Sequence, residues 1–373
     1  MKKILFLIPT LGGGGAERVL VNLVNNLDQT KYQITIQTLF KSGVNAQFLR
    51  KEITIKEGRF RQFRGNVLLL KMFSSKNLFR FFIREKYDII VSYLEGPTAR
   101  IVAGCTDKST KLVSWIHVEQ HTSEAMAYSF RSVPEALSCY HRFDMTVFVS
   151  ETVQQDFLSL CHPMNHIVLY NTNDDTRIRS LAKQPLDYTL SDQINVFTIG
   201  RLVEQKGFDR LVEVHKLLLD EGFQHHLYIL GEGEERALLT HKINDLGLSE
   251  SCHLLGFKEN PYPYLAKADL FVCSSRREGF STAVTESLIL GVPVVSTCCS
   301  GAYELLGQNN EYGVVTENST TGILDGMRKM LADPCTLQHY KQQAALRGAQ
   351  FSKEKTVAAV EYCFDQLLKG ESV

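Results

Sequence analysis

The sequence predicts an α/β fold made of two doubly wound domains in tandem. Short apolar runs alternate with helical patterns, and such runs without polar alternation are typical of parallel strands buried on both faces. The runs are residues 4–8, 34–39, 88–92, 111–116, 145–150, 194–199, 227–230, 269–273 and 293–296. Each half of the chain also begins alike, with a strand, a glycine-containing loop and a helix, at residues 3–15 and 195–207. This repeated plan is that of two doubly wound domains.

Composition agrees with two globular domains. The chain has 373 residues, of which 44% are hydrophobic, and its 41 basic side chains balance 41 acidic ones. At about 150 residues per domain the length suggests two domains, and the composition excludes a disordered or fibrous protein. A net charge of zero argues against binding nucleic acid, which needs a basic surface.

The start of the chain and its cysteines predict a cytoplasmic protein. Residues 1–8 resemble the start of a signal peptide, but Pro9 and four glycines follow at once, so a first buried strand is the better interpretation. No apolar stretch approaches the roughly 18 residues of a membrane-spanning helix. The nine cysteines form no Cys-x-x-Cys pair and are odd in number, which favours a reducing compartment.

A polar stretch separates the two halves. Residues 171–193 lack the strand and helix patterns and contain Pro185, as a linker does. We therefore expect an N-terminal domain at residues 1–185 and a C-terminal domain at 186–350. Residues 351–373 form a last helix that can return to the first domain.

The first glycine loop is suited to an anion. Residues 12–15 are all glycine and precede a helix, whose N-terminal amides and dipole favour negative charge. A dinucleotide fingerprint would need a third glycine where Glu17 or Arg18 stands, so NAD is not favoured. A tight turn needed only for packing is the alternative.

The second loop places two cations after a buried strand. Arg201 offers a fork of donors and Lys206 a point charge, a pair suited to a diphosphate. They lie where doubly wound sheets bind ligands. The alternative is an ordinary solvated loop.

A third motif combines two carboxylates with a helix start. Ser281 or Thr282 can cap the helix, which leaves Glu278 in the loop and Glu286 one turn inside. Both carboxylates can then face one ligand, and the amides of Thr282 and Ala283 can meet a phosphate. The alternative is a Glu278 favoured by the helix dipole and a solvated Glu286.

Together these motifs resemble the family 4 retaining glycosyltransferases of the GT-B fold. The resemblance covers nearly the whole chain and implies two Rossmann-like domains that face a central cleft. The segments that carry it are 14–18, 200–201 with 206–207, 231–233, 255–257 with 260–262, and the glutamates 278 and 286.

The resemblance also implies roles for individual residues. Arg201 and Lys206 match the cations that hold the donor diphosphate and stabilise the leaving group. The other implied donor contacts are Gly14 and Gly15 with the phosphates, Gly256 and Phe257 with the base, Glu286 with the ribose, Glu278 with the sugar, and the helix start Phe280, Ser281, Thr282 and Ala283. His117, at the end of a strand, matches the histidine that reaches the transferred sugar. The implied catalytic set is His117, Arg201, Lys206 and Glu278.

Three departures from the family pattern matter. Asn171 is followed by Thr172 rather than proline, which affects the hinge, and Ser281 stands where many members have Gly or Pro, which leaves the donor sugar open. No Asp-x-Asp occurs, so we expect no metal ion to hold the donor. We also expect no cofactor, since the nucleotide-sugar donor implied by the resemblance is a substrate. His117 and His121 lack the glutamate of the metalloprotease pattern.

The implied activity is retaining, metal-independent transfer of a hexosyl-type sugar. The expected donor is a nucleotide sugar, with UDP as the nucleotide, and the acceptor a glycan or lipid-linked molecule of bacterial envelope polysaccharide synthesis. The alternatives are a nucleotide-sugar epimerase on the same fold and a non-catalytic partner that binds sugar nucleotides.

Residues 56–86 need a separate explanation. They include nine basic side chains, interleaved with six phenylalanines, against Glu57 and Glu85. The basic residues are 56, 59, 61, 64, 71, 76, 80, 84 and 86, and the phenylalanines are 60, 63, 73, 79, 81 and 82. This combination suits the surface of an anionic membrane, which would make the protein peripheral on the inner face of the plasma membrane. A core-packing helix with a solvated basic face is an equal alternative.

Overall fold

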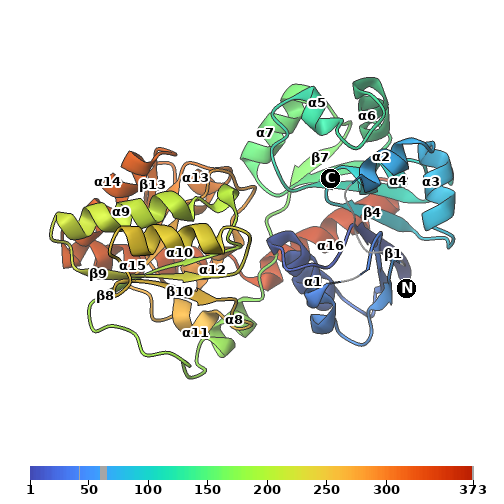
Figure 1. Cartoon of the computed structure of the whole chain (residues 1–373). Coiled ribbons are helices and arrows are strands. Elements are labelled where there is room, and N and C mark those ends of the chain that lie inside the picture. Colours follow the sequence, from blue (N-terminus) through green and yellow to red (C-terminus); the bar gives the residue numbers. More distant parts are fainter. Residues whose placement is uncertain (42, 59–64, 372–373) are drawn as a thin grey trace. The chain divides into compact units, whose positions relative to one another are not determined.

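A computed structural model describes residues 1–41, 43–58 and 65–371 of the chain (Figure 1). The chain forms two compact units, one of residues 1–172 with 353–373 and one of residues 173–352. The division lies before the predicted boundary at residue 185 because helix α8 (Asp175–Leu181) packs on α11 (Tyr262–Leu265) and α12 (Thr282–Ile289) of the second unit. The polar stretch predicted as a linker therefore belongs largely to unit 2.

Unit 1 contains a parallel sheet of seven strands in the order β3-β2-β1-β4-β5-β6-β7. Residues 4–8 of its first strand are completely buried, as expected for a central strand covered on both faces. The strands are β1 Lys2–Ile8, β2 Tyr32–Thr38, β3 Thr54–Lys56, β4 Ile89–Tyr93, β5 Lys111–Ile116, β6 Met145–Phe148 and β7 His166–Val168.

The helices of unit 1 come from both ends of the chain. The last helix, α16 (Lys353–Lys369), packs on α1 (Gly15–Asn26). Its buried Phe364 contacts Phe6 of β1 with ring centroids 6.2 Å apart, and its Asp365 accepts a hydrogen bond of 2.7 Å from Tyr32 Oη. The other helices are the 3₁₀ helix η1 Val44–Phe48, α2 Asn66–Lys71, α3 Ser75–Phe82, α4 Pro97–Val102, α5 Ser123–Met126, α6 Val133–Tyr140 and α7 Glu151–Leu160.

Unit 2 contains a parallel sheet of six strands in the order β10-β9-β8-β11-β12-β13. Its core lies between the central strands and helices α9 (Phe208–Asp220) and α14 (Thr320–Leu331), where Leu211 and Met327 are fully buried. The strands are β8 Ile194–Ile199, β9 His225–Leu230, β10 Cys252–Gly256, β11 Leu270–Cys273, β12 Val294–Thr297 and β13 Val314–Thr316.

The remaining helices of unit 2 complete the doubly wound pattern. They are the 3₁₀ helix η2 Glu204–Lys206, α10 Arg236–Asp245, α13 Ala302–Leu306 and α15 Pro334–Gly348. His215 in α9 is fully buried, as its helical periodicity predicts, and its ring nitrogens bond to His225 (2.8 Å) and Ser251 (2.9 Å). No helix within the described residues has the length and apolar run that a bilayer span requires.

Each sheet reverses its strand order near the centre, between β1 and β4 in unit 1 and between β8 and β11 in unit 2. All the strand pairings are parallel, so the strands of one sheet have their carboxyl ends at the same edge. Such sheets bind ligands at that edge, beside the point of reversal. A ligand site is therefore expected at these two points.

Candidate functional site

In unit 2 the two loops beside the reversal point carry the predicted cations and one of the two predicted carboxylates. Arg201 and Lys206 follow β8, and Glu278 follows β11. Gly256 ends β10 at the same edge. The predicted donor residues of this unit therefore gather at one edge of one sheet.

Glycines hold the Arg201 loop in place. The Gly200 amide donates to the Leu230 carbonyl (3.0 Å) and the Leu202 amide to the Glu232 carbonyl (2.9 Å). A Cβ atom at Gly231, whose φ is 145°, would overlap the Gly200 carbonyl oxygen, and one at Gly233 would overlap the Leu202 carbonyl. The Gly-Glu-Gly motif thus allows the loops after β8 and β9 to pack backbone against backbone.

A buried arginine joins the loops after β8 and β11. Arg210 of α9 is 7% exposed, and its guanidinium donates to the carbonyls of Ser274 and Ser275. Ser274 Oγ in turn donates to the Lys206 carbonyl (2.9 Å). All these bonds are accepted by backbone carbonyls, so they fix the conformation of both loops. The fixed backbone brings Lys206 beside Glu278.

Lys206 and Glu278 form a direct ion pair. Lys206 Nζ lies 2.5 Å from Glu278 Oε1, and the Ser275 hydroxyl donates to the same oxygen at 2.6 Å. Burial opposes the charge of Lys206, but the Glu278 carboxylate outweighs it and the pKa of Lys206 is raised. The lysine therefore stays charged at neutral pH. Its ammonium has three N–H donors, so it can bind a phosphate oxygen while it keeps this pair.

Arg201 is the exposed cation of the loop. No hydrogen bond or ion pair of its guanidinium occurs within residues 1–41, 43–58 and 65–371. An exposed guanidinium next to a charged lysine favours an anionic ligand.

Helix α12 begins as the sequence predicts. Of the two possible caps, the structure selects Ser281, whose hydroxyl accepts from the Val284 amide at 3.4 Å. Glu286 lies one turn inside and accepts a hydrogen bond of 3.0 Å from the Tyr262 hydroxyl. Thr282 and Ala283 are half-buried at the helix start, whereas the Phe280 side chain is buried and its ring centroid lies 6.3 Å from that of Phe351. The Phe280 side chain therefore packs in the interior of unit 2 and leaves the surface of the helix start to its neighbours.

Gly256 and Phe257 present an exposed aromatic ring at the same edge. Gly256 has a φ of 74°, in the left-handed region that favours glycine, and its carbonyl accepts from the Gly231 amide at 2.9 Å. Phe257 is 65% exposed. An aromatic side chain this exposed can stack on a planar base.

In unit 1 the glycine loop and Glu95 lie beside the reversal point, after β1 and β4 respectively. Gly14 caps α1, which starts at Gly15. The Glu17 carboxylate folds back over this turn. It lies so close to Gly14 that a Cβ atom at residue 14 would overlap it. The Gly14 backbone itself is extended, with a φ of −82°, so the overlap would be with a flexible side chain only. A carboxylate therefore covers the helix start where we predicted a phosphate.

His117 is buried after β5, with 6% of its surface exposed. Its backbone amide donates to Glu95 Oε2 at 3.0 Å, while its Nε2 atom is buried without a hydrogen-bond partner in the described structure. Burial lowers the pKa of His117 to about 3, so the imidazole is neutral at physiological pH. A neutral imidazole can exchange hydrogen bonds with a sugar hydroxyl but carries no charge for an anion.

Aromatic residues surround His117. The Tyr93 ring centroid lies 4.6 Å from that of His117, and the Trp115 ring is stacked with it at 6.5 Å. The Tyr93 hydroxyl and Trp115 Nε1 are also buried without partners in the described structure. Unsatisfied buried polar atoms are costly, and several in one cluster point to a polar ligand.

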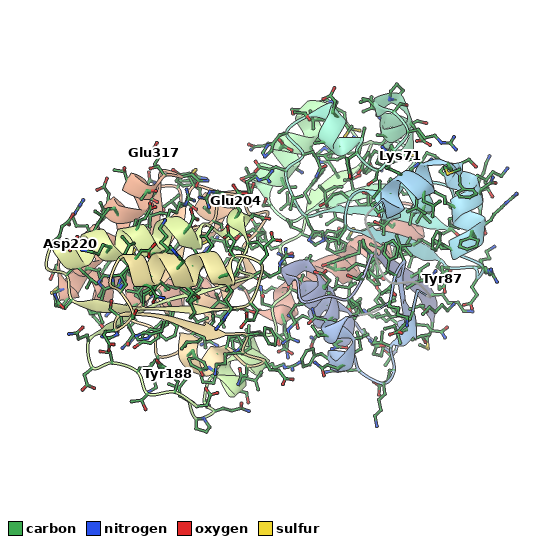
Figure 2. The ribbon with its side chains drawn as sticks, in the orientation of Figure 1. Lys71, Tyr87, Tyr188, Glu204, Asp220 and Glu317 are labelled. Atoms are coloured by element: carbon green, nitrogen blue, oxygen red, sulfur yellow. The ribbon has the colours of Figure 1, made fainter. Side chains whose placement is uncertain are left out.

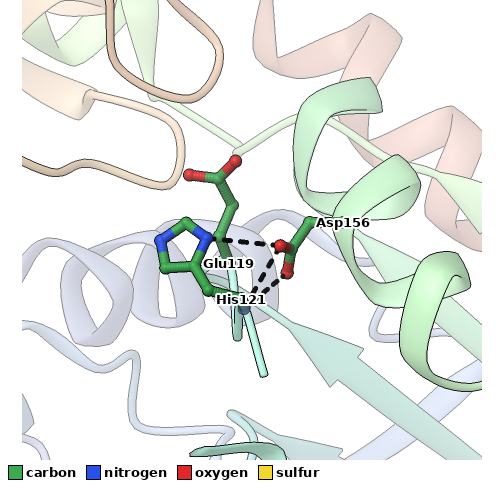
Figure 3. Close-up of side chains that lie close together, drawn as sticks. All are labelled: Glu119, His121 and Asp156. Carbon is green, nitrogen blue, oxygen red and sulfur yellow. Dashed lines mark hydrogen bonds and ion pairs between the residues drawn. The ribbon is translucent and has the colours of Figure 1, made fainter. Parts of the chain in front are cut away.

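His121 belongs to a different cluster from His117. Ligand atoms of Glu119, His121 and Asp156 lie within 4.8 Å of one another (Figure 3). Asp156 accepts hydrogen bonds from the amides of Gln120 (2.6 Å) and His121 (3.2 Å), and it lies 3.3 Å from His121 Nδ1. These bonds explain the arrangement as the anchor of a loop on α7.

Sequence reasoning missed the residues that support the predicted ones. Ser275, Glu95 and Tyr262 bond to Glu278, the His117 amide and Glu286 respectively. Ser275 and Glu95 each follow a buried strand, and that position was the available signal. Tyr262 lies in segment 260–262 of the family resemblance, which implies no role for it.

Both units have the parallel doubly wound architecture of the GT-B glycosyltransferases, the class that this fold and edge define. A model of the Glycosyltransferase Family 4 matches residues 13–177, and one of the Glycosyl transferases group 1 matches residues 187–347. The chain belongs to this family of glycosyltransferases. The sequence prediction of family and fold is thereby confirmed.

Relatives and solved structures agree with this assignment. The N-acetylgalactosamine-N,N'-diacetylbacillosaminyl-diphospho-undecaprenol 4-alpha-N-acetylgalactosaminyltransferase of Campylobacter jejuni is 28% identical over 95% of this chain and 97% of its own. The lipopolysaccharide core biosynthesis glycosyltransferase LpsE of Rhizobium meliloti is 27% identical over 96% of each chain. The crystal structure of HepE from Anabaena in complex with UDP-glucose shares the fold, with a TM-score of 0.78 at 20% identity over 98% of this chain and 100% of that one.

Proposed function

We propose that this glycosyltransferase transfers a sugar from a UDP-sugar to a lipid-linked or glycan acceptor of the bacterial envelope, with retention at the anomeric carbon. The observation that carries the donor site is the pair of loops around Lys206 and Glu278, with Arg201 exposed beside them. The names of the relatives support an envelope acceptor, since one concerns a diphospho-undecaprenol-linked sugar and another the lipopolysaccharide core. The UDP-glucose complex of HepE supports the donor class.

In the proposed mechanism the protein orients the donor and stabilises charge. Arg201 and Lys206 bind the diphosphate and offset the negative charge that develops as it leaves. Glu278 accepts hydrogen bonds from the sugar hydroxyls, and the neutral His117 imidazole bonds to another. We propose front-face attack, in which the leaving phosphate takes the acceptor proton, because the assigned roles leave no second carboxylate as nucleophile.

Product analysis tests this function. Proton NMR of the first product formed from a UDP-α-sugar and an isolated lipid-linked acceptor should show an α linkage. A β linkage would contradict retention. Incubation with donor alone should leave the sugar unchanged, whereas an isomerised sugar nucleotide would identify an epimerase and binding without any turnover a non-catalytic partner.

Activity is expected to persist in excess chelator. Arg201 and Lys206 supply the positive charge that a divalent ion would otherwise supply to the diphosphate. Initial rates after EDTA treatment and gel filtration should stay within about twofold of the untreated rate. Strict dependence on added magnesium or manganese would contradict the proposal, and Asp156→Asn would then show whether the cluster of Figure 3 holds the ion.

We also propose that α2 and α3 of unit 1 bind an anionic membrane. Apolar side chains are exposed on and beside these helices, and they include Leu68, Leu69, Met72, Phe73 and Phe81. Exposed Lys76, Arg80 and Arg84 accompany them, and Lys71 ends α2 (Figure 2). Lipid is the occupant that matches both properties, because basic side chains pair with anionic headgroups while apolar ones enter the acyl boundary.

Other residues of the basic stretch have different roles. Lys56 pairs with Glu85 at 2.7 Å and Lys86 with Asp107 at 3.1 Å. Residues 59–64, which contain three of the predicted basic residues and Phe60 and Phe63, lie outside the described residues. The exposure of Phe73 and Phe81 favours the membrane over core packing for these two rings.

The exposed apolar segment is held firmly by two arginines. Arg100, which is 1% exposed, donates to the carbonyls of Leu70 (2.9 Å) and Phe73 (2.7 Å) and pairs with Glu135. Arg131 donates to the carbonyls of Lys71 (2.8 Å) and Met72 (3.2 Å). The backbone is therefore fixed while its apolar side chains face outward, so a substitution of these side chains leaves the fold intact.

Changing Lys76 and Arg80 together to glutamine should weaken binding to anionic vesicles about 10- to 30-fold at low salt, because each basic residue contributes on the order of 1 kcal/mol. Co-sedimentation with phosphatidylglycerol vesicles measures this, and UDP affinity should not change. The control is Lys267→Gln with Lys341→Gln, two exposed lysines of unit 2. An equal loss of vesicle binding in the two double variants, or no vesicle binding by the unaltered protein, would refute the proposed membrane-binding surface.

A further inference from the structure

The Tyr262 side chain joins the Asn-Pro-Tyr motif to the proposed ribose carboxylate. Tyr262 is 6% exposed, and its hydroxyl donates to Glu286 Oε1 at 3.0 Å. The two residues come from different helices, α11 and α12, so the bond is a tertiary contact rather than a local one. It reaches the carboxylate from inside the protein.

Helix α11 is itself anchored at its start. Asn260 Nδ2 donates to the Leu181 carbonyl (3.2 Å) and to Gln184 Oε1 (2.8 Å). Asn260 Oδ1 accepts from the Tyr262 amide at 3.3 Å. Pro261 then supplies a backbone angle that suits a helix start. The motif therefore fixes the backbone position of Tyr262, and burial of the side chain fixes the position of its hydroxyl.

We infer that Tyr262 is a positioning residue that holds the Glu286 carboxylate for the two ribose hydroxyls of the donor. This inference rests on the proposed function, in which Glu286 binds the ribose. A glutamate on a helix surface has flexible side-chain torsions, and ordering them on binding costs free energy. A rigid tyrosine that orders the carboxylate beforehand reduces that cost.

The chemistry of the carboxylate allows both contacts at once. An ionised carboxylate has about four acceptor sites on its two oxygens, and the tyrosine hydroxyl uses one of them. The bond from Tyr262 therefore does not by itself exclude the two neighbouring hydroxyls of a ribose. A hydroxyl donor is also neutral, so it orients the carboxylate without cancelling its charge.

The test compares nucleotides with and without the ribose hydroxyls. Tyr262→Phe removes the donor and keeps the ring, and it should weaken UDP binding about 3- to 10-fold, because the lost bond orders the carboxylate but does not itself contact the nucleotide. Binding of 2′,3′-dideoxy-UDP should be unchanged. In a Glu286→Ala background the same substitution should have no further effect, because the coupled partner is gone. The KM for the donor should rise while kcat stays within about twofold.

The matched control is Tyr264→Phe on the same helix. Tyr264 is 2% exposed, and its hydroxyl bonds to Asp187 rather than to Glu286. This variant should bind both nucleotides as the unaltered protein does. Isothermal titration calorimetry gives the affinities, and melting temperatures confirm that the variants fold.

Failure of the inference and failure of the proposed function differ in outcome. If Glu286→Ala weakens UDP but Tyr262→Phe does not, or if Tyr262→Phe weakens both nucleotides equally, the positioning role is refuted and the donor site stands. If UDP and dideoxy-UDP bind the unaltered protein equally, the ribose role of Glu286 is wrong and the inference falls with it. If no uridine nucleotide binds at all, the proposed donor is wrong.

Discussion

Replacement of Arg201 by alanine is expected to lower turnover by about 100-fold or more, the scale seen when a donor that stabilises a developing anion is removed. The guanidinium is exposed and makes no side-chain bond within the described residues, so its loss should leave the fold unchanged. Initial rates at saturating donor measure the effect. Near-normal rates in a folded variant would show that the diphosphate lies elsewhere.

Lys206→Ala should lower turnover to a similar extent, and it should destabilise the fold more than Arg201→Ala does. Glu278, whose side chain is 12% exposed, would lose its ion partner and keep only the Ser275 hydroxyl. A buried carboxylate without its cation is destabilising. Arg328→Ala serves as the control for both variants, because it removes a half-exposed arginine of the same unit. Arg328 of α14 pairs with Asp325 of the same helix and with Glu221, which directly follows α9. That variant should keep its activity.

Gly231→Ala is expected to destabilise unit 2 by about 3 kcal/mol, through overlap with the Gly200 carbonyl and through backbone strain at a φ of 145°. A loss of this size lowers the melting temperature of a unit of this length by about 6–12 °C. Since Gly200 directly precedes Arg201, the shift should also reduce turnover by about tenfold or more. Differential scanning calorimetry and initial rates measure the two effects.

Gly222→Ala separates overlap from strain. Gly222 also has a positive φ, 93°, but a Cβ there would meet no atom within 4 Å. Only the strain of about 1 kcal/mol should then appear, with normal activity. Equal destabilisation in the two variants would mean that the packing of the loops after β8 and β9 is less important than we infer.

The central part of both sheets was predictable from sequence, and their edges were not. All nine predicted apolar runs contain strands, because buried parallel strands are continuously apolar. The missed strands were β3, β7, β10 and β13. All four lie on the outside of a sheet, β3, β7 and β13 have only three residues, and β10 is mostly half-exposed, so their apolar signal is short or diluted.

For the site, sequence predicted which residues gather but not how they bond. Strand ends and glycine loops placed Arg201, Lys206 and Glu278 at one edge, since parallel strands end together. The Lys206–Glu278 pair and the Tyr262–Glu286 bond join residues 72 and 24 positions apart. Such contacts depend on loop conformations set by Arg210 and on helix packing, which carry no periodic signal. The position of the Glu17 side chain over the glycine turn could not be predicted for the same reason.

The return of α16 to unit 1 has a consequence for synthesis on the ribosome. Once residue 172 is made, all seven strands of the first sheet exist, but the helix that covers Phe6 and bonds to Tyr32 lies beyond residue 352. At about 5–20 residues per second, translation of residues 173–352 takes roughly ten to forty seconds. During that interval the nascent first unit has an uncovered apolar face, whereas the second unit is continuous in sequence and can fold as soon as it emerges.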